Sequence, residues 1–244
     1  MPSDRTPERR PAGSGRQPEI IAHRGVPREC PENSLPGFRR ALELGADGIE
    51  LDVHLTADGV VVVHHDAWLR GAPGLPARGP LIRDVPASAL ADHPLAPGVS
   101  IPLLADVLAL VDGRATVYVE VKAANMEREV LACLAGSPTR CAIHSFDHRI
   151  PLRAASLGSE TPTGVLVGSY LLDPATVLDG ALARDYWQWH EMIDTELVRR
   201  VHRVGGRVVA WTVNDIGEAR RLRAIGVDAL CTDMCGELRQ GLRE

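Results

Sequence analysis

Charged side chains stand at alternate positions in two short apolar stretches of the chain. Glu50 and Asp52 flank a leucine, and Glu120 and Lys122 flank a valine, so within each extended stretch both polar side chains point to one side. Three carboxylates that meet in one place repel one another, and a hard divalent cation, Mg²⁺ or Ca²⁺, relieves that repulsion. Glu50, Asp52 and Glu120 are therefore candidate metal ligands. A salt-bridge network with Arg24 and Lys122 is the alternative, and the residue types alone favour neither.

Histidines stand at the ends of two predicted strands, where they suit proton transfer near neutral pH. His23 follows the first strand, and the adjacent pair His64 and His65 ends a hairpin. Neighbours on a strand point to opposite sides, so only one of that pair can face a common site with His23. His54 lies four residues after Glu50 on the same side and either contacts the metal or fills the interior. The chain has nine histidines, so most of them have no catalytic role.

Strand-like and helix-like stretches alternate along the chain and position these side chains. The pattern predicts eight β/α units: 19–22 with 34–44, 48–54 with 103–111, 116–121 with 126–134, 140–145 with 148–157, 163–167 with 174–183, 186–190 with 195–204, 207–213 with 216–225, and 229–231 with a last short helix. Eight such units at this length favour a closed (β/α)8 TIM barrel, in which the polar strand ends meet at the carboxyl-terminal mouth. An open doubly wound sheet is less favoured, because no Gly-x-Gly-x-x-Gly motif follows the first strand.

One connection, 67–102, interrupts this alternation. It holds seven Pro and four Gly, and it follows a predicted hairpin whose turn is Ala57-Asp58-Gly59. Long loops in compact domains are usually functional or disordered. We therefore expect a lid or specificity insertion over the barrel mouth, with a disordered linker as the alternative. The whole of 19–244 is expected to be one domain, and 1–18, with four Pro and four Arg, a flexible tail.

The composition excludes several functional classes. The 244 residues carry a formal net charge of −5, whereas general binding of nucleic acids needs a basic surface. No apolar run approaches the ~20 residues of a transmembrane helix. Five cysteines without a Cys-x-x-Cys pair are typical of reduced thiols in the cytoplasm, where we expect the protein to be located. Lys122 is the only lysine beside 26 arginines, which makes its ammonium group a candidate for a specific task.

A series of short motifs runs in order from residue 19 to about 235. It comprises His23-Arg24-Gly25, Pro31-Glu32-Asn33-Ser34, Gly45-Ala46-Asp47, Glu50-Leu51-Asp52-Val53, Thr56-Ala57-Asp58-Gly59, His65-Asp66, Ile101-Pro102-Leu103, Glu120-Val121-Lys122, Ser145-Phe146, Trp211-Thr212-Val213-Asn214 and Thr232-Asp233. No single motif is specific, but the ordered set resembles the glycerophosphodiester phosphodiesterase family. Ser34 stands where the family usually has Thr, and Met234 where it often has Pro. The connection 67–102 matches poorly and leaves the substrate preference open.

The resemblance implies a TIM barrel that hydrolyses small-molecule glycerophosphodiesters to glycerol 3-phosphate and an alcohol with a divalent cation. The roles implied by position are metal ligation by Glu50, Asp52 and Glu120, acid–base catalysis by His23 and His65, phosphate binding by Arg24 and Lys122, and a substrate groove lined by Trp211 and Phe146. On this basis His65, rather than His64, faces the site. We hypothesise that the substrate's own glycerol hydroxyl attacks phosphorus and forms a cyclic phosphate, which water then opens.

Other functions fit some of these residues. A related phosphodiesterase would act on lysophospholipids or release the cyclic phosphate as its final product. A barrel lyase would use Lys122 as a Schiff-base nucleophile, but such a lysine needs a lowered pKa, whereas nearby carboxylates favour its charged form. A non-catalytic binding barrel would have no need of both histidines and three carboxylates. In the stretch 186–190, we expect one of the two tryptophans in the core and the other in the groove. The oligomeric state is left open.

Overall fold

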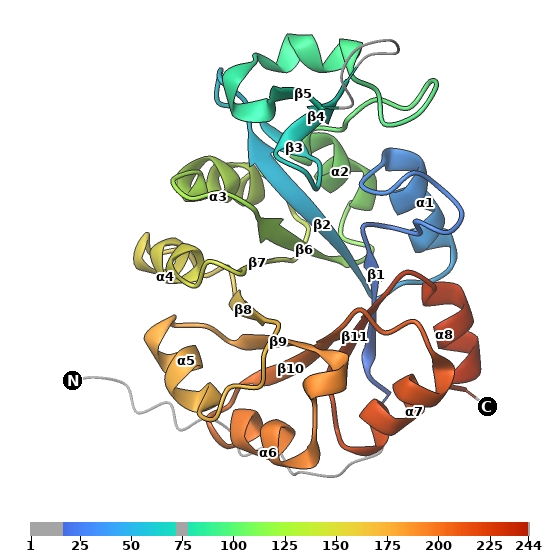
Figure 1. Ribbon diagram of the computed structural model, residues 1–244, viewed down its shortest axis with the longest axis vertical. Helices are drawn as coiled ribbons and strands as arrows, with labels where there is room; N and C mark the ends of the chain where they lie inside the picture. The colour runs from blue at the N-terminus through green and yellow to red at the C-terminus, as the bar shows by residue number, and fades with distance from the viewer. Residues whose placement is uncertain (1–16, 72–77, 244) are drawn as a thin grey trace.

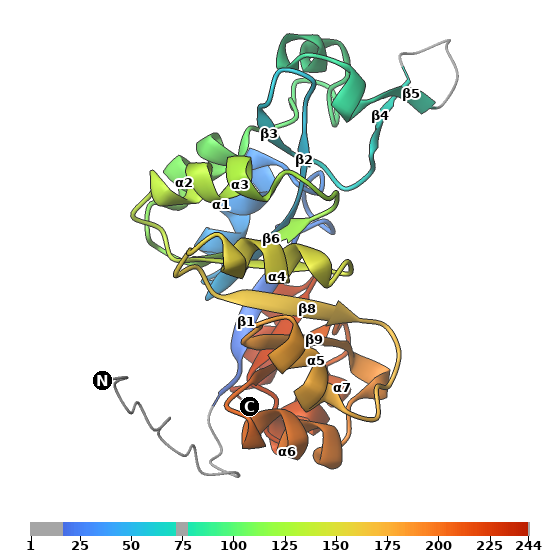
Figure 2. The same ribbon diagram turned by 90° about the vertical axis from the view of Figure 1, so that its left-hand side faces the viewer.

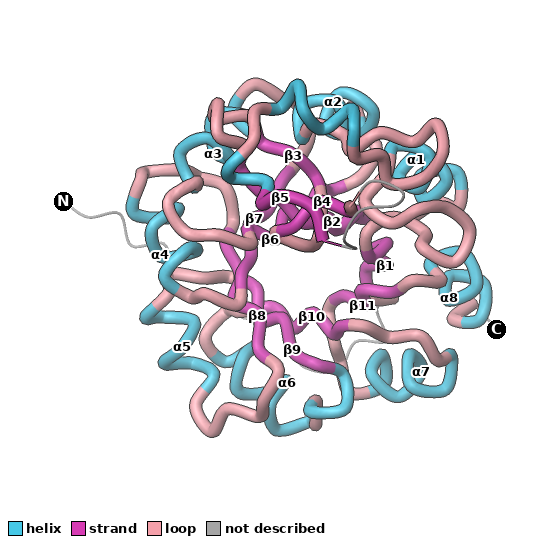
Figure 3. The backbone as a smooth tube through the Cα atoms, turned by 45° about the horizontal axis from the view of Figure 1, so that its top comes forward, coloured by secondary structure: helices cyan, strands magenta, loops and turns pink. Residues whose placement is uncertain are grey.

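The computed structural model describes residues 17–71 and 78–243, so nearly all of the expected tail at 1–18 lies outside the described residues. Within them, eight parallel strands form a closed barrel in the order β1-β11-β10-β9-β8-β7-β6-β2, and β1 pairs with β2 to complete the ring. Figure 3 shows the helices arranged around this ring of strands. The predicted TIM barrel is therefore confirmed.

The described part of the chain contains eight α-helices beside the barrel strands. The barrel strands are β1 (Glu19–His23), β2 (Gly48–Leu55), β6 (Thr116–Val121), β7 (Cys141–Ser145), β8 (Thr163–Val167), β9 (Asp185–Trp189), β10 (Arg207–Trp211) and β11 (Ala229–Thr232). The helices are α1 (Leu35–Glu43), α2 (Leu104–Val111), α3 (Glu127–Ala135), α4 (Arg149–Ser156), α5 (Pro174–Gly180), α6 (Thr195–Arg203), α7 (Ile216–Ala224) and α8 (Cys235–Gly241). None of these helices is long and apolar enough to cross a membrane.

Capping residues explain where several helices begin. The Ser34 hydroxyl accepts a hydrogen bond of 3.1 Å from the backbone N–H of Gly37 at the start of α1. The Asp194 carboxylate does the same for Leu197 at the start of α6, at 2.7 Å. Each cap satisfies a backbone donor that the first helical turn leaves without a partner. Serine in place of the family's usual threonine therefore preserves the cap.

Two apolar layers hold the barrel together. Alternate strand residues point outward and form a large core with the helices, while their neighbours point inward. The inward side chains that fill the barrel are Ile21, Tyr118, Ala142, Leu166, Trp187, Val209, Ala229 and Cys231. These buried side chains form an apolar plug inside the barrel.

The connection 67–102 has secondary structure and a small core of its own. The predicted hairpin places β3 (Val61–Val63) antiparallel to β2. Beyond it, β4 (Trp68–Arg70) pairs with β5 (Arg78–Leu81), and 3₁₀ helices cover Ile82–Asp84 and Ala87–Asp92. Five side chains form the core that joins this segment to β3: Val62, Leu69, Ile82, Leu90 and Ile101. Figures 1 and 2 show it at one end of the molecule, beyond β2 and β3. Its role as a lid stays a prediction.

Candidate active site

A cavity of about 230 Å³ opens where the barrel strands end at their carboxyl termini. Its walls are formed by His23, Arg24, Glu50, His65, Glu120, Lys122, His144, Phe146, Leu166, Trp187, Trp211, Thr212 and Cys231. Every site residue expected from the sequence therefore lines this cavity except Asp52, which is fully buried and contacts the lining residues Arg24 and Lys122. Short parallel strands deliver these side chains to one end because all their carboxyl termini face the same way.

His23 is held by a chain of hydrogen bonds. Its Nδ1 donates to Asp233 Oδ1 at 2.7 Å, and the other oxygen of Asp233 accepts from Asn214 Nδ2 at 2.6 Å. This fixes the imidazole so that Nε2 faces Glu50 Oε2 at 4.0 Å. Burial lowers the pKa of His23, but the hydrogen bond to Asp233 and the charge of Glu50 outweigh it, so the pKa lies above its ordinary value.

His65 also lines the cavity, and an aspartate engages its Nδ1 as Asp233 engages that of His23. Its Nδ1 lies 2.8 Å from Asp66 Oδ1, and a third of the side chain is exposed. The neighbouring His64 places Nδ1 2.8 Å from the Asp66 carbonyl and does not line the cavity. His54 donates from Nε2 to the His65 carbonyl at 3.1 Å, and burial lowers the pKa of His54. This hydrogen bond explains the position of His54 in the interior without a role in metal binding.

Asp52 lies at the centre of an ion-pair network. Arg24 Nε is 3.1 Å from its Oδ2, and Lys122 Nζ is 3.3 Å from its Oδ1. Asn33, a residue with a positive φ of 54°, donates from Nδ2 to Oδ2 at 2.8 Å and accepts from the Asp52 N–H at 3.3 Å. Burial alone would raise the pKa of Asp52, but Arg24 and Lys122 hold it below its ordinary value. The salt-bridge network considered from the sequence is therefore present.

Around Asp52, the carboxylates outnumber the permanent cations. Lys122 donates to Glu120 Oε1 at 2.8 Å, while Glu50 Oε2 accepts the backbone N–H of Arg24 at 3.2 Å. Burial raises the pKa of Glu120, and the negative charge of Asp52 raises it further. The two carboxylates also keep the pKa of Lys122 high despite its burial, the opposite of what a Schiff-base lysine needs. Three carboxylates thus face two permanent cations.

One group of side chains is arranged so that it could hold a metal ion. Donor atoms of Glu50, Glu120 and His144 all lie within 4.8 Å of one another, and all three residues are buried. Asp52 is not in this group, but its buried Oδ1 has no well-aligned hydrogen-bond donor among the residues described. Predominantly oxygen donors with excess negative charge suit a divalent cation. That Asp52 completes the ligand set with Glu50 and Glu120 stays a prediction.

Aromatic side chains form one wall of the cavity. Trp211 packs edge-on against Phe146 with ring centroids 5.4 Å apart and lies 5.9 Å from Trp189. Phe146 and Trp189 are about half exposed, whereas Trp187 is fully buried in the plug. Trp187 therefore lies in the core as expected, whereas Trp189 is exposed but does not line the cavity, so its place in a substrate groove stays a prediction.

The sequence alone did not point to Asn33, Asp233, Asn214 or His144 as site residues. Asp233 follows β11 and meets His23 only because β11 pairs with β1 when the barrel closes. His144 faces the interior directly opposite Glu120 in the register of the adjacent strand. These polar residues lie at or near strand ends, but their place in the site can be recognised only when it is known which strands pair.

A TIM barrel whose ionisable side chains converge at the carboxyl-terminal mouth is the arrangement of an enzyme. The model of the Glycerophosphoryl diester phosphodiesterase family matches residues 23–237 of this chain. A glycerophosphodiester phosphodiesterase of Caldanaerobacter subterraneus subsp. tengcongensis is 31% identical over 230 residues, which cover 88% of this chain and 93% of the relative. One from Bacillus altitudinis is 30% identical over 236 residues, with 88% and 94% covered.

Solved structures show the same architecture. A glycerophosphodiester phosphodiesterase from Thermotoga maritima superimposes with a TM-score of 0.78 at 26% identity, covering 92% of this chain and 98% of the other. An Oleispira antarctica phosphodiesterase in complex with the product sn-glycerol-3-phosphate gives a TM-score of 0.82 at 24% identity, with 93% and 98% covered. The chain belongs to the glycerophosphoryl diester phosphodiesterase family and is a phosphoric diester hydrolase.

Proposed function

We propose that this enzyme hydrolyses glycerophosphodiesters to glycerol 3-phosphate and an alcohol in a reaction that requires a divalent cation. The observation that carries the proposal is that two histidines, two permanent cations and two carboxylates line one cavity. The names of the relatives and the glycerol 3-phosphate bound by the Oleispira antarctica structure support this substrate class.

The charges of the cavity suit an anionic phosphodiester. Lys122 and Arg24 line the cavity wall and, in this proposal, contact the non-bridging oxygens, on which negative charge accumulates in the transition state. A divalent cation bound by the carboxylates supplies Lewis-acid polarisation of the phosphoryl group. In this proposal Glu50, Asp52 and Glu120 hold that cation, for which Mg²⁺ and Ca²⁺ are the expected candidates.

The two histidines are arranged for proton transfer through the same ring atom. Asp233 engages Nδ1 of His23, and Asp66 engages Nδ1 of His65, so each presents Nε2 for proton transfer. One histidine removes the proton of the substrate's glycerol hydroxyl as its oxygen bonds to phosphorus. The other gives a proton to the alcohol oxygen as its bond to phosphorus breaks. Water then opens the resulting cyclic phosphate, with the two histidines exchanging roles.

A substrate panel tests this function. Glycerophosphodiesters with different headgroups, and lysophospholipids, are assayed with Mg²⁺, Ca²⁺, Mn²⁺ or a chelator in separate reactions. We expect hydrolysis that the chelator abolishes and a divalent cation restores. Turnover that is insensitive to the chelator would contradict the metal requirement. A cyclic phosphate in rapid-quench samples would support the proposed route, and its absence in a slow variant would contradict it.

Lysophospholipids are a second candidate substrate class, favoured by the aromatic wall. Phe146 and Trp189 expose about half of their apolar side chains beside the cavity, enough to contact an acyl chain. Faster turnover of lysophospholipids than of glycerophosphodiesters in the same panel would establish this alternative.

A further inference from the structure

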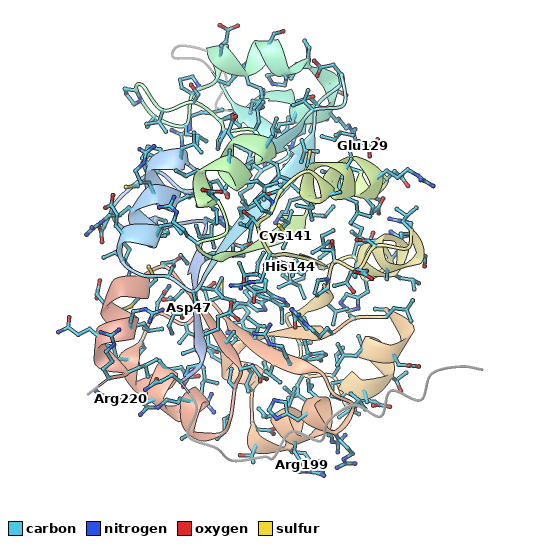
Figure 4. The ribbon with its side chains drawn as sticks, turned by 180° about the vertical axis from the view of Figure 1, so that it is seen from behind. Asp47, Glu129, Cys141, His144, Arg199 and Arg220 are labelled. Carbon is cyan, nitrogen blue, oxygen red and sulfur yellow. The ribbon has the colours of Figure 1, made fainter. Side chains whose placement is uncertain are left out.

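His144 projects from β7 into the barrel interior beside the carboxylates. In the sheet register it lies opposite Glu120 on β6, and its Nε2 is 3.6 Å from Glu50 Oε1. The side chain is almost completely buried. Figure 4 shows His144 near the middle of the barrel, whereas Arg199 and Arg220 lie on outer helices. The imidazole is therefore a component of the site and not of the surface.

Packing fixes the plane of this ring, but hydrogen bonds do not explain its position. The imidazole stacks on the buried indole of Trp187 with centroids 4.1 Å apart and planes 7° from parallel. Its Nδ1 is buried and finds no hydrogen-bond partner in the described part of the chain. The separation of Nε2 from Glu50 is too long for a hydrogen bond.

A cation would explain why Nε2 of His144 lies close to Glu50 without a hydrogen bond between them. If Nε2 carries a lone pair, the carboxylates of Glu50 and Glu120 repel that lone pair unless a positive ion lies between them. The donor atoms of all three residues lie within 4.8 Å of one another, a spacing at which one ion can contact each of them. A neutral imidazole is also a common metal ligand.

We propose that His144 is a protein ligand of the bound cation, together with Glu50 and Glu120, and that it makes the site favour first-row transition dications over Mg²⁺ and Ca²⁺. Imidazole nitrogen binds such ions well, whereas Mg²⁺ and Ca²⁺ prefer oxygen donors. This inference rests on the metal requirement in the proposed function and narrows the choice of metal beyond the Mg²⁺ or Ca²⁺ expected from the sequence.

The direct test uses metal binding and not turnover. Metal-free protein is loaded with Mn²⁺, and pulsed electron paramagnetic resonance records whether ¹⁴N from an imidazole is coupled to the ion. Calorimetric titrations with Co²⁺ and Mg²⁺ measure the two affinities. Each measurement is repeated on His144→Gln and on a control, His148→Gln, because His148 binds the Leu166 carbonyl at 2.9 Å and does not line the cavity.

We expect ¹⁴N coupling in the wild type and in the control, and its loss in His144→Gln. The Co²⁺ affinity of that variant falls at least about tenfold, while its Mg²⁺ affinity changes less, because the amide replaces nitrogen by an oxygen donor. Absence of the coupling in the wild type, or its retention in the variant, overturns the proposal. Equal losses for both ions also overturn it, because His144 would then only position Glu50.

Two further measurements keep the outcome unambiguous. If circular dichroism shows that His144→Gln is unfolded, His144→Asn replaces it, and the wild-type spectrum alone can still overturn the proposal. A hydrolysis assay run in parallel separates the two hypotheses. Coupled ¹⁴N without hydrolysis contradicts the proposed function alone, whereas hydrolysis without coupled ¹⁴N contradicts the ligand proposal alone.

Discussion

The two ends of the barrel both carry charged side chains, but the charges are balanced at only one of them. At the amino-terminal end, Arg207 lies 2.6 Å from Glu19 and 3.6 Å from Asp185. Arg184 forms two hydrogen bonds with Asp185, at 2.8 and 2.6 Å, and the Tyr118 hydroxyl donates to Glu19 at 2.8 Å. Two carboxylates therefore meet two guanidinium groups, and this end has the composition of a structural ion-pair cluster.

At the mouth, by contrast, three carboxylates meet two permanent cations, and the pKa of Glu120 is raised by burial and by its acidic neighbours. Glu50 has no arginine or lysine side chain as an ion-pair partner among the residues described. The amino-terminal end satisfies its charges within the protein, whereas the mouth keeps a charge excess for a ligand. The difference separates stability from function within one barrel, and it leads to four predictions.

The largest expected effect is on catalysis at the mouth. Replacing His23 by Gln removes one of the two proposed proton-transfer groups, so we expect kcat to fall by about 10³-fold, or ~4 kcal/mol in the barrier. Steady-state assays at saturating metal measure this, and thermal unfolding should change little. The control is His202→Gln at the other end of the barrel, where His202 pairs with Asp228 at 2.7 Å. A fall of less than tenfold for His23→Gln would show that His23 has no role in proton transfer.

At the amino-terminal end the expected effect is on stability. Arg207→Met leaves Glu19 and Asp185 without their shared partner, so we expect the free energy of unfolding to fall by about 3 kcal/mol. Denaturant titration measures it, and kcat per folded molecule should stay near the wild-type value. Arg199→Met is the control, because Arg199 forms a solvent-exposed pair with Glu196 on α6, and the loss of such a pair should change the free energy of unfolding far less. Similar losses for both variants would show that the cluster has no special role.

Exchange of the only lysine should have an intermediate effect. Lys122 reaches Glu120 at 2.8 Å and Asp52 at 3.3 Å with one compact ammonium group. In the proposed function, the larger planar guanidinium of Lys122→Arg cannot occupy that position without displacing the substrate's phosphate, so we expect a loss of about 30-fold in kcat/KM, or ~2 kcal/mol. Steady-state kinetics with a glycerophosphodiester measure this. Near-normal turnover would mean that any cation serves there.

The smallest predicted effect has the opposite sign. Glu120→Gln removes one of three mutually repelling carboxylates, so the metal-free variant should be more stable than the wild type by about 1 kcal/mol at neutral pH. Because the folded-state pKa of Glu120 is raised, ionisation of this group destabilises the folded wild type above that pKa. The advantage of the variant should therefore disappear as pH falls through the raised pKa and Glu120 becomes protonated.

Denaturant titrations of both metal-free proteins across the acid range measure this difference. An unstable variant at neutral pH would show that the Lys122 ion pair outweighs the repulsion, and the contrast between the two ends would then be wrong.

The barrel itself was predictable because its signals are local. Alternation of short apolar runs with amphipathic stretches recurs every few tens of residues, and the charged pairs Glu50/Asp52 and Glu120/Lys122 are visible within single short stretches. The structure described within the connection 67–102, residues 67–71 and 78–102, was harder to predict, because its strands have only three or four residues and offer almost no periodicity. Its core depends on contacts between residues such as Leu69 and Ile101, which are distant in the sequence.

The site was only partly predictable for a related reason. Eight of its nine expected residues line the cavity, because strand ends identify them without knowledge of the pairing. Asp233 and His144 escaped notice since their importance depends on which strands become neighbours. Asn33 escaped notice because it acts through Asp52 and not through the cavity.

The apolar plug in the middle of the barrel also limits how substrate enters the cavity and how products leave it. Within the described part of the chain, Trp187, Tyr118 and their neighbours fill the barrel interior below the cavity and close it on that side. Substrate, water and both products must pass the same opening in turn. In the proposed reaction, glycerol 3-phosphate that stays in the cavity keeps the next substrate out, and inhibition by this product should be competitive. Substitutions that speed turnover should then occur at the opening of the cavity, where residues can change without disturbing the packed barrel interior.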